Sequence, residues 1–161
     1  MKNIKYLLIL FILAFTSQVF SQTVYNFTDG LAQAKSQNKK VIVEIYIPDN
    51  TWVDKMNGIY AEPAISSILA SSFVFVRLNA SGTETYSYGG KNISAADLAR
   101  QFEAMSYPTH VFLNPDGSVI TFLYNGATSR NVPGYMDAGD FEQVLIYFRD
   151  GKTSTDLSTI L

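Results

Sequence analysis

Residues Tyr107–Ile120 read YPTHVFLNPDGSVI, and this stretch says more about the fold than any other part of the chain. Thr109–Leu113 is a short apolar run that follows a proline, which favours a buried strand. Asn114–Gly117 (NPDG) has proline in the second position and glycine in the fourth, which fits a type I turn. We therefore predict an antiparallel hairpin between Thr109–Leu113 and the following run, Ser118–Tyr124.

Outward from this stretch, strands and helices are predicted to alternate. Val41–Ile47 (VIVEIYI) is rich in β-branched residues and nearly continuous in apolar character, so it suits a central strand that is covered on both faces. Phe73–Leu78 is a second such strand. Helices are predicted through Ser36 with Thr28 as the cap, after a cap at Asp49 or Asn50 and including Met56, from Pro63, at Ala95–Met105 and at Asp140–Phe148. This order predicts a mixed sheet with helices on both faces, interrupted by a surface insertion at Asn79–Asn92.

The composition excludes several classes of function. The chain has 161 residues, enough for one domain, and it contains no cysteine. Disulfides, thiolate zinc sites, iron–sulfur clusters and cysteine nucleophiles are therefore excluded. The net charge of −2 provides no basic surface, so nucleic acid is not an expected partner.

The N-terminus has the pattern of a secretory signal. Two lysines precede the apolar run Tyr6–Phe15, and a polar segment leads to the small residue Ser21. An uncleaved membrane anchor is the alternative, but this run is shorter than the roughly 20 residues that a spanning helix needs. We expect a signal peptide at 1–21, one domain at 22–150, a C-terminal tail at 151–161, and a periplasmic or secreted protein with no membrane attachment after cleavage.

In their order, the apolar strands, helices and turns resemble those of thioredoxin-fold proteins, specifically exported bacterial thioredoxin-related proteins. The resemblance rests on KKVIVEIY, EPAISSIL, SSFVFVRLN, ISAADLARQF, YPTHVFLNPDGSVI and PGYMDAGDFEQVLIYF, which together span most of 27–150. It implies a three-layer α/β/α fold with a central mixed sheet.

The sequence departs from that family at the family's active site. The Cys-x-x-Cys pair of the family falls on Asn50, Thr51, Trp52 and Val53 in this chain, so both cysteines are replaced. A family cysteine at the first position reacts because the helix N-terminus stabilises its thiolate. Asn50 can instead cap the same helix with its side-chain oxygen. The resemblance thus implies a scaffold from which the thiol chemistry is missing.

By the same resemblance, Pro108 corresponds to the family's cis-proline. The preceding residue, Tyr107, would then offer its backbone to an extended peptide, with Thr109 following on the strand. An ordinary trans proline at the start of a strand is the alternative.

Three further residues have open interpretations. Glu44 resembles the family's buried acid. If it is buried without a cationic partner, burial raises its pKa. Alternatively, Glu44 points to solvent or pairs with a lysine. Trp52 is either an exposed binding anchor or a side chain folded over the core. His110, the only histidine, is expected to be structural or a surface residue, because no catalytic or zinc-binding partner can be named for it.

We therefore expect a redox-inactive domain that binds an extended peptide or a protein partner in a groove between Asn50–Val53 and Tyr107–Thr109. We expect no catalytic residue, cofactor or metal; Asp49, Asp54 and Asn50 lack the glycine and glutamate of a calcium loop. Two alternatives stay open. One is a non-thiol enzyme that uses Glu44 as an acid or base. The other is a structural subunit whose insertion, 79–92, fills the groove. The partner's identity and the oligomeric state are not predicted.

Overall fold

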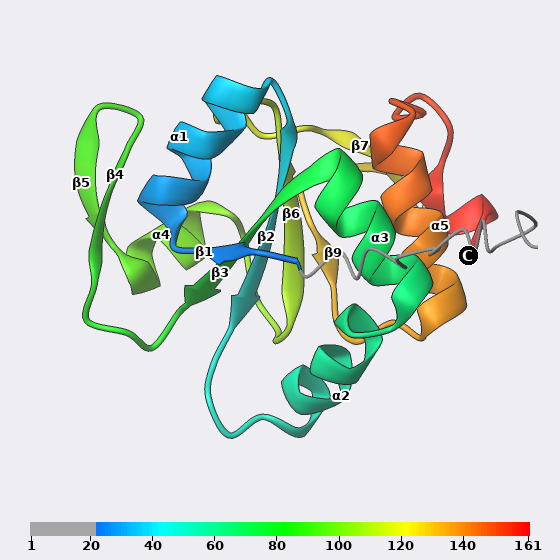
Figure 1. Ribbon diagram of the computed structural model, residues 1–161, viewed down its shortest axis with the longest axis horizontal. Helices are drawn as coiled ribbons and strands as arrows, with labels where there is room; N and C mark the ends of the chain where they lie inside the picture. The colour runs from blue at the N-terminus through cyan, green and yellow to red at the C-terminus, as the bar shows by residue number, and fades with distance from the viewer. Residues whose placement is uncertain (1–21) are drawn as a thin grey trace, which may run out of the picture.

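The computed structural model describes residues 22–161 and consists of a central sheet between two groups of helices (Figure 1). The predicted signal peptide lies outside the described residues. The helices are α1 (Phe27–Gln37), α2 (Thr51–Tyr60), α3 (Pro63–Ser72), α4 (Ala95–Gln101) and α5 (Ala138–Arg149). The strands are β1 (Val24–Tyr25), β2 (Lys40–Tyr46), β3 (Phe73–Asn79), β4 (Thr85–Tyr88), β5 (Lys91–Ser94), β6 (Thr109–Leu113), β7 (Phe122–Tyr124), β8 (Ala127–Ser129) and β9 (Val132–Pro133). A short 3-10 turn, η1 (Leu157–Thr159), follows α5.

The central sheet has five strands in the order β1-β3-β2-β6-β9. β1, β3 and β2 run parallel, whereas β6 is antiparallel to β2 and β9 is antiparallel to β6. The expected mixed sheet is therefore confirmed. Among the described residues, none of the helices is both long and apolar enough to cross a membrane.

Alternate side chains of the central strands fill two separate cores. On β2, Ile42 packs into the core beneath α2, α3 and α5, whereas Val41, Val43 and Ile45 pack into the core beneath α1 and α4. Figure 1 shows these two groups of helices on opposite sides of the sheet. Burial on both faces explains why β2 and β3 are apolar nearly throughout.

Four of the described helices begin at a capping side chain, whereas α3 begins with Pro63 and has no such cap. Asn26 caps α1, Asn50 caps α2, Ser94 caps α4 and Asp137 caps α5, each by accepting a backbone N–H of the first turn. The predicted cap of α1, Thr28, is wrong by two residues, because Asn26 takes that role. α4 also ends earlier than predicted, at Gln101.

Helix α1 packs very close to the sheet at Gly30. A Cβ atom at this position would lie 2.1 Å from Cγ2 of Val76 on β3, so only glycine permits this approach. The buried face of α1 is thereby fixed against the central sheet.

The hairpin predicted after β6 is only partly present. The turn at Asn114–Gly117 forms, with the Gly117 N–H donating to the Asn114 carbonyl, and a single bridge joins Leu113 to Val119. The chain then leaves β6. β7 pairs with β8 in a separate two-stranded sheet, and β9 occupies the edge of β6 instead. Phe122 of β7 instead packs in the core, where its ring lies edge-on against Phe148.

The segment predicted as an irregular insertion, 79–92, is largely ordered. β3 extends to Asn79, and the strands β4 and β5 form a hairpin around Gly89 and Gly90, both with positive φ. Tyr86 and Tyr88 contact the ring of Phe27 edge-on, with centroids 5.7 and 5.5 Å apart. The hairpin is therefore part of the core beneath α1 and α4.

Candidate functional site

The first turn of α2 and its cap contain Asn50–Val53, the residues expected at the position of the cysteine motif. The side-chain oxygen of Asn50 accepts the N–H groups of Trp52 at 3.0 Å and of Val53 at 3.2 Å. The expectation that Asn50 caps this helix is confirmed. Val53 is buried, whereas Thr51 and Trp52 are exposed. The first turn therefore presents an aromatic side chain at the surface and keeps its apolar side in the core.

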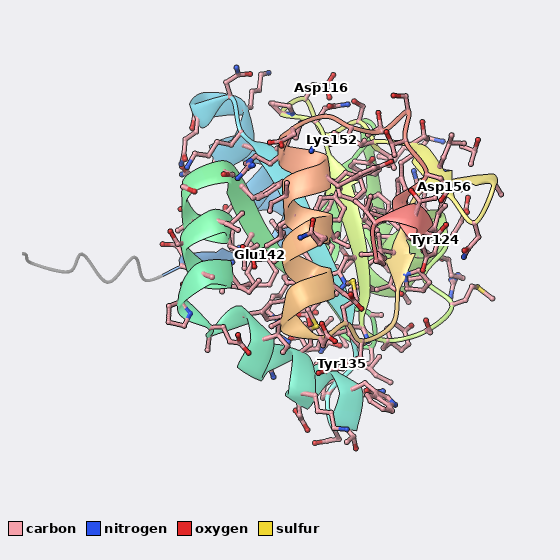
Figure 2. All side chains as sticks on the ribbon, turned by 90° about the vertical axis from the view of Figure 1, so that its right-hand side faces the viewer. Asp116, Tyr124, Tyr135, Glu142, Lys152 and Asp156 are labelled. Atoms are coloured by element: carbon pink, nitrogen blue, oxygen red, sulfur yellow. The ribbon has the colours of Figure 1, made fainter. Side chains whose placement is uncertain are left out.

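Trp52 is half exposed and lies against a second exposed aromatic residue. Its ring centroid is 5.6 Å from that of Tyr135, which follows β9 and is 37% exposed. Nζ of Lys55 lies 4.3 Å from the Trp52 ring centroid, in cation–π range. Figure 2 shows Tyr135 beside α2 at one end of the molecule. Of the two interpretations of Trp52, the structure supports the one that has its side chain on the surface.

The loop before β6 is joined by a hydrogen bond to the segment that carries Tyr135. The Tyr107–Pro108 peptide bond is cis, and the Pro108 carbonyl accepts the Gly134 N–H at 2.8 Å. Thr109 is fully buried, and its hydroxyl donates to the Ser106 carbonyl at 2.6 Å. Among residues 22–161, no hydrogen bond involves the backbone N–H or carbonyl of Tyr107.

These two parts of the site meet through the 134–135 segment. Gly134 binds the Pro108 carbonyl, and the next residue, Tyr135, packs on Trp52. The register of β2 against β6 also pairs Ile45 with Thr109, so the end of β2 that leads to α2 lies beside the Pro108 loop. The predicted groove residues are thus gathered at one end of the sheet, but Val53, Pro108 and Thr109 are buried and do not offer their side chains to a partner.

Tyr135 is a site residue that the sequence does not predict. It lies in the segment Pro133–Asp137 (PGYMD), between the last strand and the last helix. An aromatic residue directly after a glycine in a loop is the only local signal for it. What the sequence does not show is that this loop lies beside the start of α2.

Beside these residues, three ionisable side chains lie next to one another across the sheet. The register pairs Glu44 of β2 with Arg77 of β3 on one side and with His110 of β6 on the other. Nε of Arg77 donates to the Glu44 carboxylate, which has no exposed surface. The Arg77 guanidinium also lies over the Tyr46 ring, 4.3 Å from its centroid. Glu44 is therefore buried, as one interpretation held, yet paired with an arginine, which neither interpretation predicted.

Tyr60 of α2 contacts this group of ionisable side chains through His110. Its hydroxyl lies 2.6 Å from Nε2 of His110, which is fully buried. Burial lowers the pKa of His110 to about 3, so the imidazole is neutral. Burial also raises the pKa of Glu44, although Arg77 and Tyr60 oppose this shift. Oε1 of Glu44 and Nδ1 of His110 have no hydrogen-bond partner among the described residues.

The burial of Glu44 and the position of the β4–β5 hairpin bear on the two alternative functions, a non-thiol enzyme and a structural subunit. Glu44 has no exposed surface, so a substrate in solution does not reach its carboxylate in this conformation. The hairpin of β4 and β5 packs on Phe27 and Phe102, on the opposite face of the sheet from α2 (Figure 1), so it does not fill the groove. Across residues 22–161, no group of three or more His, Cys, Asp or Glu side chains is arranged to hold a metal ion.

Comparison with solved structures identifies the class of fold. A thioredoxin-fold protein from Helicobacter pylori superposes with a TM-score of 0.63 at 20% identity, covering 76% of this chain and 80% of that one. A thioredoxin from Thermus thermophilus gives 0.57 at 21% identity, over 80% of this chain and 87% of that one. A mutant thioredoxin from Halobacterium salinarum gives 0.51 at 13% identity, over 85% of this chain and 95% of that one.

The protein therefore has the thioredoxin fold, as the resemblance of its sequence implied. It is a thioredoxin-like chain that contains no cysteine. No protein-family model matches the chain, and no curated protein matches its sequence.

Proposed function

We propose that this protein is an exported, redox-inactive binding domain that holds an extended peptide or a peptide segment of a partner protein. The partner lies in the groove between the first turn of α2 and the Tyr107–Pro108 loop. The observation that carries the proposal is the exposed pair of Trp52 and Tyr135 beside a Tyr107 backbone that has no hydrogen-bond partner in the described part of the chain.

The two features supply the two components of peptide binding. An unpaired N–H and carbonyl can pair with the backbone of an extended peptide, which gives affinity independent of sequence. The aromatic pair offers a large apolar surface with few rotatable bonds, and aromatic residues of this kind dominate binding energies at interfaces. Together they favour an extended segment with an apolar or aromatic side chain that packs on Trp52.

The absence of thiols supports the redox-inactive part of the proposal. Thiol–disulfide exchange proceeds by attack of a thiolate on a disulfide, and this chain supplies no sulfur of that kind. The position that would carry the nucleophile is occupied by the capping side chain of Asn50. Burial of Glu44 supports the absence of acid–base catalysis at the same place.

Export is supported by the sequence of residues 1–21. Two lysines, an apolar run and a small residue before the expected cleavage point form a signal-peptide pattern. N-terminal sequencing of the protein from the envelope fraction of its host tests this part separately.

Selection of peptides from a random phage-displayed library tests the binding function. We expect the protein beginning at Gln22 to enrich peptides that share an apolar or aromatic position. The same peptides should bind the Trp52→Ala variant at least about tenfold more weakly, since truncation of an aromatic anchor costs about 2 kcal/mol or more. Enrichment of peptides whose affinity does not change in that variant would overturn the proposed groove, and a failure to enrich any peptide would overturn the function.

A further inference from the structure

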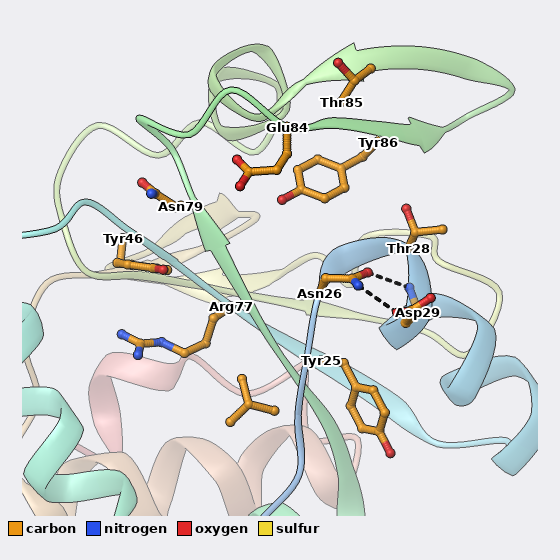
Figure 3. Close-up of a pocket in the computed structure, with 11 residues that line it drawn as sticks. Tyr25, Asn26, Thr28, Asp29, Tyr46, Arg77, Asn79, Glu84, Thr85 and Tyr86 are labelled. Carbon is orange, nitrogen blue, oxygen red and sulfur yellow. Dashed lines mark hydrogen bonds between the residues drawn. The ribbon is translucent and has the colours of Figure 1, made fainter.

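A second hollow lies on the opposite edge of the sheet from β9 and shares no residue with the groove. It has a volume of about 590 Å³ and lies between β1, the start of α1, the ends of β2 and β3, and the start of β4 (Figure 3). Its lining combines the tyrosines Tyr25, Tyr46 and Tyr86 with the charged residues Asp29, Arg77 and Glu84. Aromatic and charged groups thus converge on one concave surface.

The charges of this hollow do not cancel. The Arg77 guanidinium is already engaged, because it pairs with buried Glu44 and lies over the Tyr46 ring. Asp29 accepts a hydrogen bond from the side chain of Asn26 at 2.7 Å, but it has no cationic partner among residues 22–161. Glu84 forms neither a hydrogen bond nor an ion pair through its carboxylate with any of the described residues. The hollow therefore has an excess of negative charge and fits a cation.

The hydroxyl of Tyr86 also lacks a partner. Tyr86 is only 9% exposed, and its ring packs on Phe27. Its hydroxyl points toward the side of the hollow on which Glu84 lies (Figure 3), yet it makes no hydrogen bond within the described part of the chain. Burial, the Glu84 charge and Tyr46 raise its pKa, so the hydroxyl stays protonated and can accept an N–H through its oxygen.

The turn before Glu84 leaves space for its carboxylate. A Cβ atom on Gly82 would lie 2.0 Å from Oε2 of Glu84, so glycine leaves room for this carboxylate. The Asn79 side chain accepts the Ser81 N–H at 3.0 Å, and the Glu84 carbonyl accepts the Ala95 N–H at 3.0 Å. The backbone on both sides of Glu84 is thereby held in place.

From these observations we propose that the hollow is a binding site for a primary alkylammonium group. The ammonium group pairs with the Glu84 carboxylate and donates to the Tyr86 hydroxyl. Its alkyl chain lies against the apolar part of the lining, since the Arg77 guanidinium already covers the Tyr46 ring. The ligand is either a free diamine or a lysine side chain, since both carry the same group on a flexible apolar chain.

Titrations followed by two-dimensional ¹H–¹⁵N NMR test the site with three probes. They are 1,5-diaminopentane, Nα-acetyl-lysine N-methylamide and its uncharged isostere, Nα-acetyl-norleucine N-methylamide. At low ionic strength we expect either or both amines to shift the amide signals of Glu84, Thr85 and Tyr86, and the norleucine derivative to leave them unchanged. Stronger binding of the diamine identifies a free amine as the ligand, and stronger binding of the lysine derivative identifies a peptide. Equal shifts with the norleucine derivative, or no shift with either amine, would overturn the proposal.

Three variants make the test specific to Glu84. Glu84→Gln removes the charge and should weaken amine binding about tenfold, the size expected for loss of one charge-assisted hydrogen bond. Gly82→Ala leaves the charge but shifts the flexible end of the Glu84 side chain, so it should weaken binding by less than Glu84→Gln does. Glu142→Gln removes a charge on α5, away from the hollow, and should leave the affinity unchanged. Equal effects of Glu84→Gln and Glu142→Gln would show that only net charge matters, and they would contradict the site.

Discussion

The ring centroids of Trp52 and Tyr135 lie 5.6 Å apart, although Trp52 belongs to the first turn of α2 and Tyr135 follows β9. Because Gly134 also binds the Pro108 carbonyl, the loop that carries Tyr135 connects both sides of the groove. The aromatic surface is thus held by two independent parts of the fold.

This pairing predicts that the two aromatic residues act together in binding. Trp52→Ala and Tyr135→Ala should each weaken binding of a selected peptide. The double variant should lose less than the sum of the two effects, since each ring depends on the other for its position. Isothermal titration calorimetry measures the three affinities. Leu123→Ala, which removes an exposed apolar side chain of β7, serves as the control and should bind as the wild type does.

The lack of cysteine predicts the outcome of an insulin-reduction assay with dithiothreitol. The wild-type protein should give no rate above the buffer. A variant with Asn50→Cys and Val53→Cys should give a protein-dependent rate, because the first thiolate would lie at the N-terminus of α2. A rate with the wild type would contradict the redox-inactive assignment.

The cap at Asn50 predicts a loss of stability that is confined to one helix end. Asn50→Ala removes the acceptor of the Trp52 and Val53 N–H groups and should lower the free energy of unfolding by about 1 kcal/mol. Asn50→Asp keeps the acceptor, adds a favourable charge to the helix N-terminus and should be as stable as the wild type or more so. Urea titration measures both. Equal losses in the two variants would show that the acceptor oxygen at this position does not stabilise the helix.

The buried imidazole predicts how stability depends on pH. The pKa of His110 is about 3 in the folded chain and about 6.5 when unfolded, so the unfolded chain binds one more proton between these values. The wild type should therefore lose up to about 1.4 kcal/mol per pH unit through His110 as the pH falls from about 6.5 to about 5, and His110→Gln should not. Glu44, whose pKa is raised, acts in the opposite direction in both proteins.

Urea titrations of both proteins at several pH values measure this difference. The stability advantage of the wild type over His110→Gln should shrink steadily over that window. A gap that is constant with pH would mean that His110 is not buried as a neutral group.

Much of the fold follows from local signals in the sequence. Continuous apolar runs identify β2 and β3 because both strands are covered on both faces. The start of α2 is predicted by Asn50. The β4–β5 hairpin is not predicted, although TYSY alternates and Gly89-Gly90 is a two-residue turn.

Other features depend on contacts between distant parts of the chain. The pairing of Glu44 with Arg77 requires the register of two parallel strands joined by two helices, and no local pattern encodes it. The strand after the Asn114–Gly117 turn pairs with β8 rather than β6, because Phe122 packs against the α5 side chain of Phe148. A turn sequence predicts where the chain reverses but not which strand it joins.

Chemical-shift mapping with a selected peptide tests the central claim most directly. In ¹H–¹⁵N spectra of the protein, we predict that the peptide shifts the Trp52 indole N–H and the backbone amides of Tyr107 and Gly134. The amides of β7 and β8 should stay in place. Shifts that leave Trp52 and Tyr107 unchanged while other surfaces respond would contradict peptide binding in this groove.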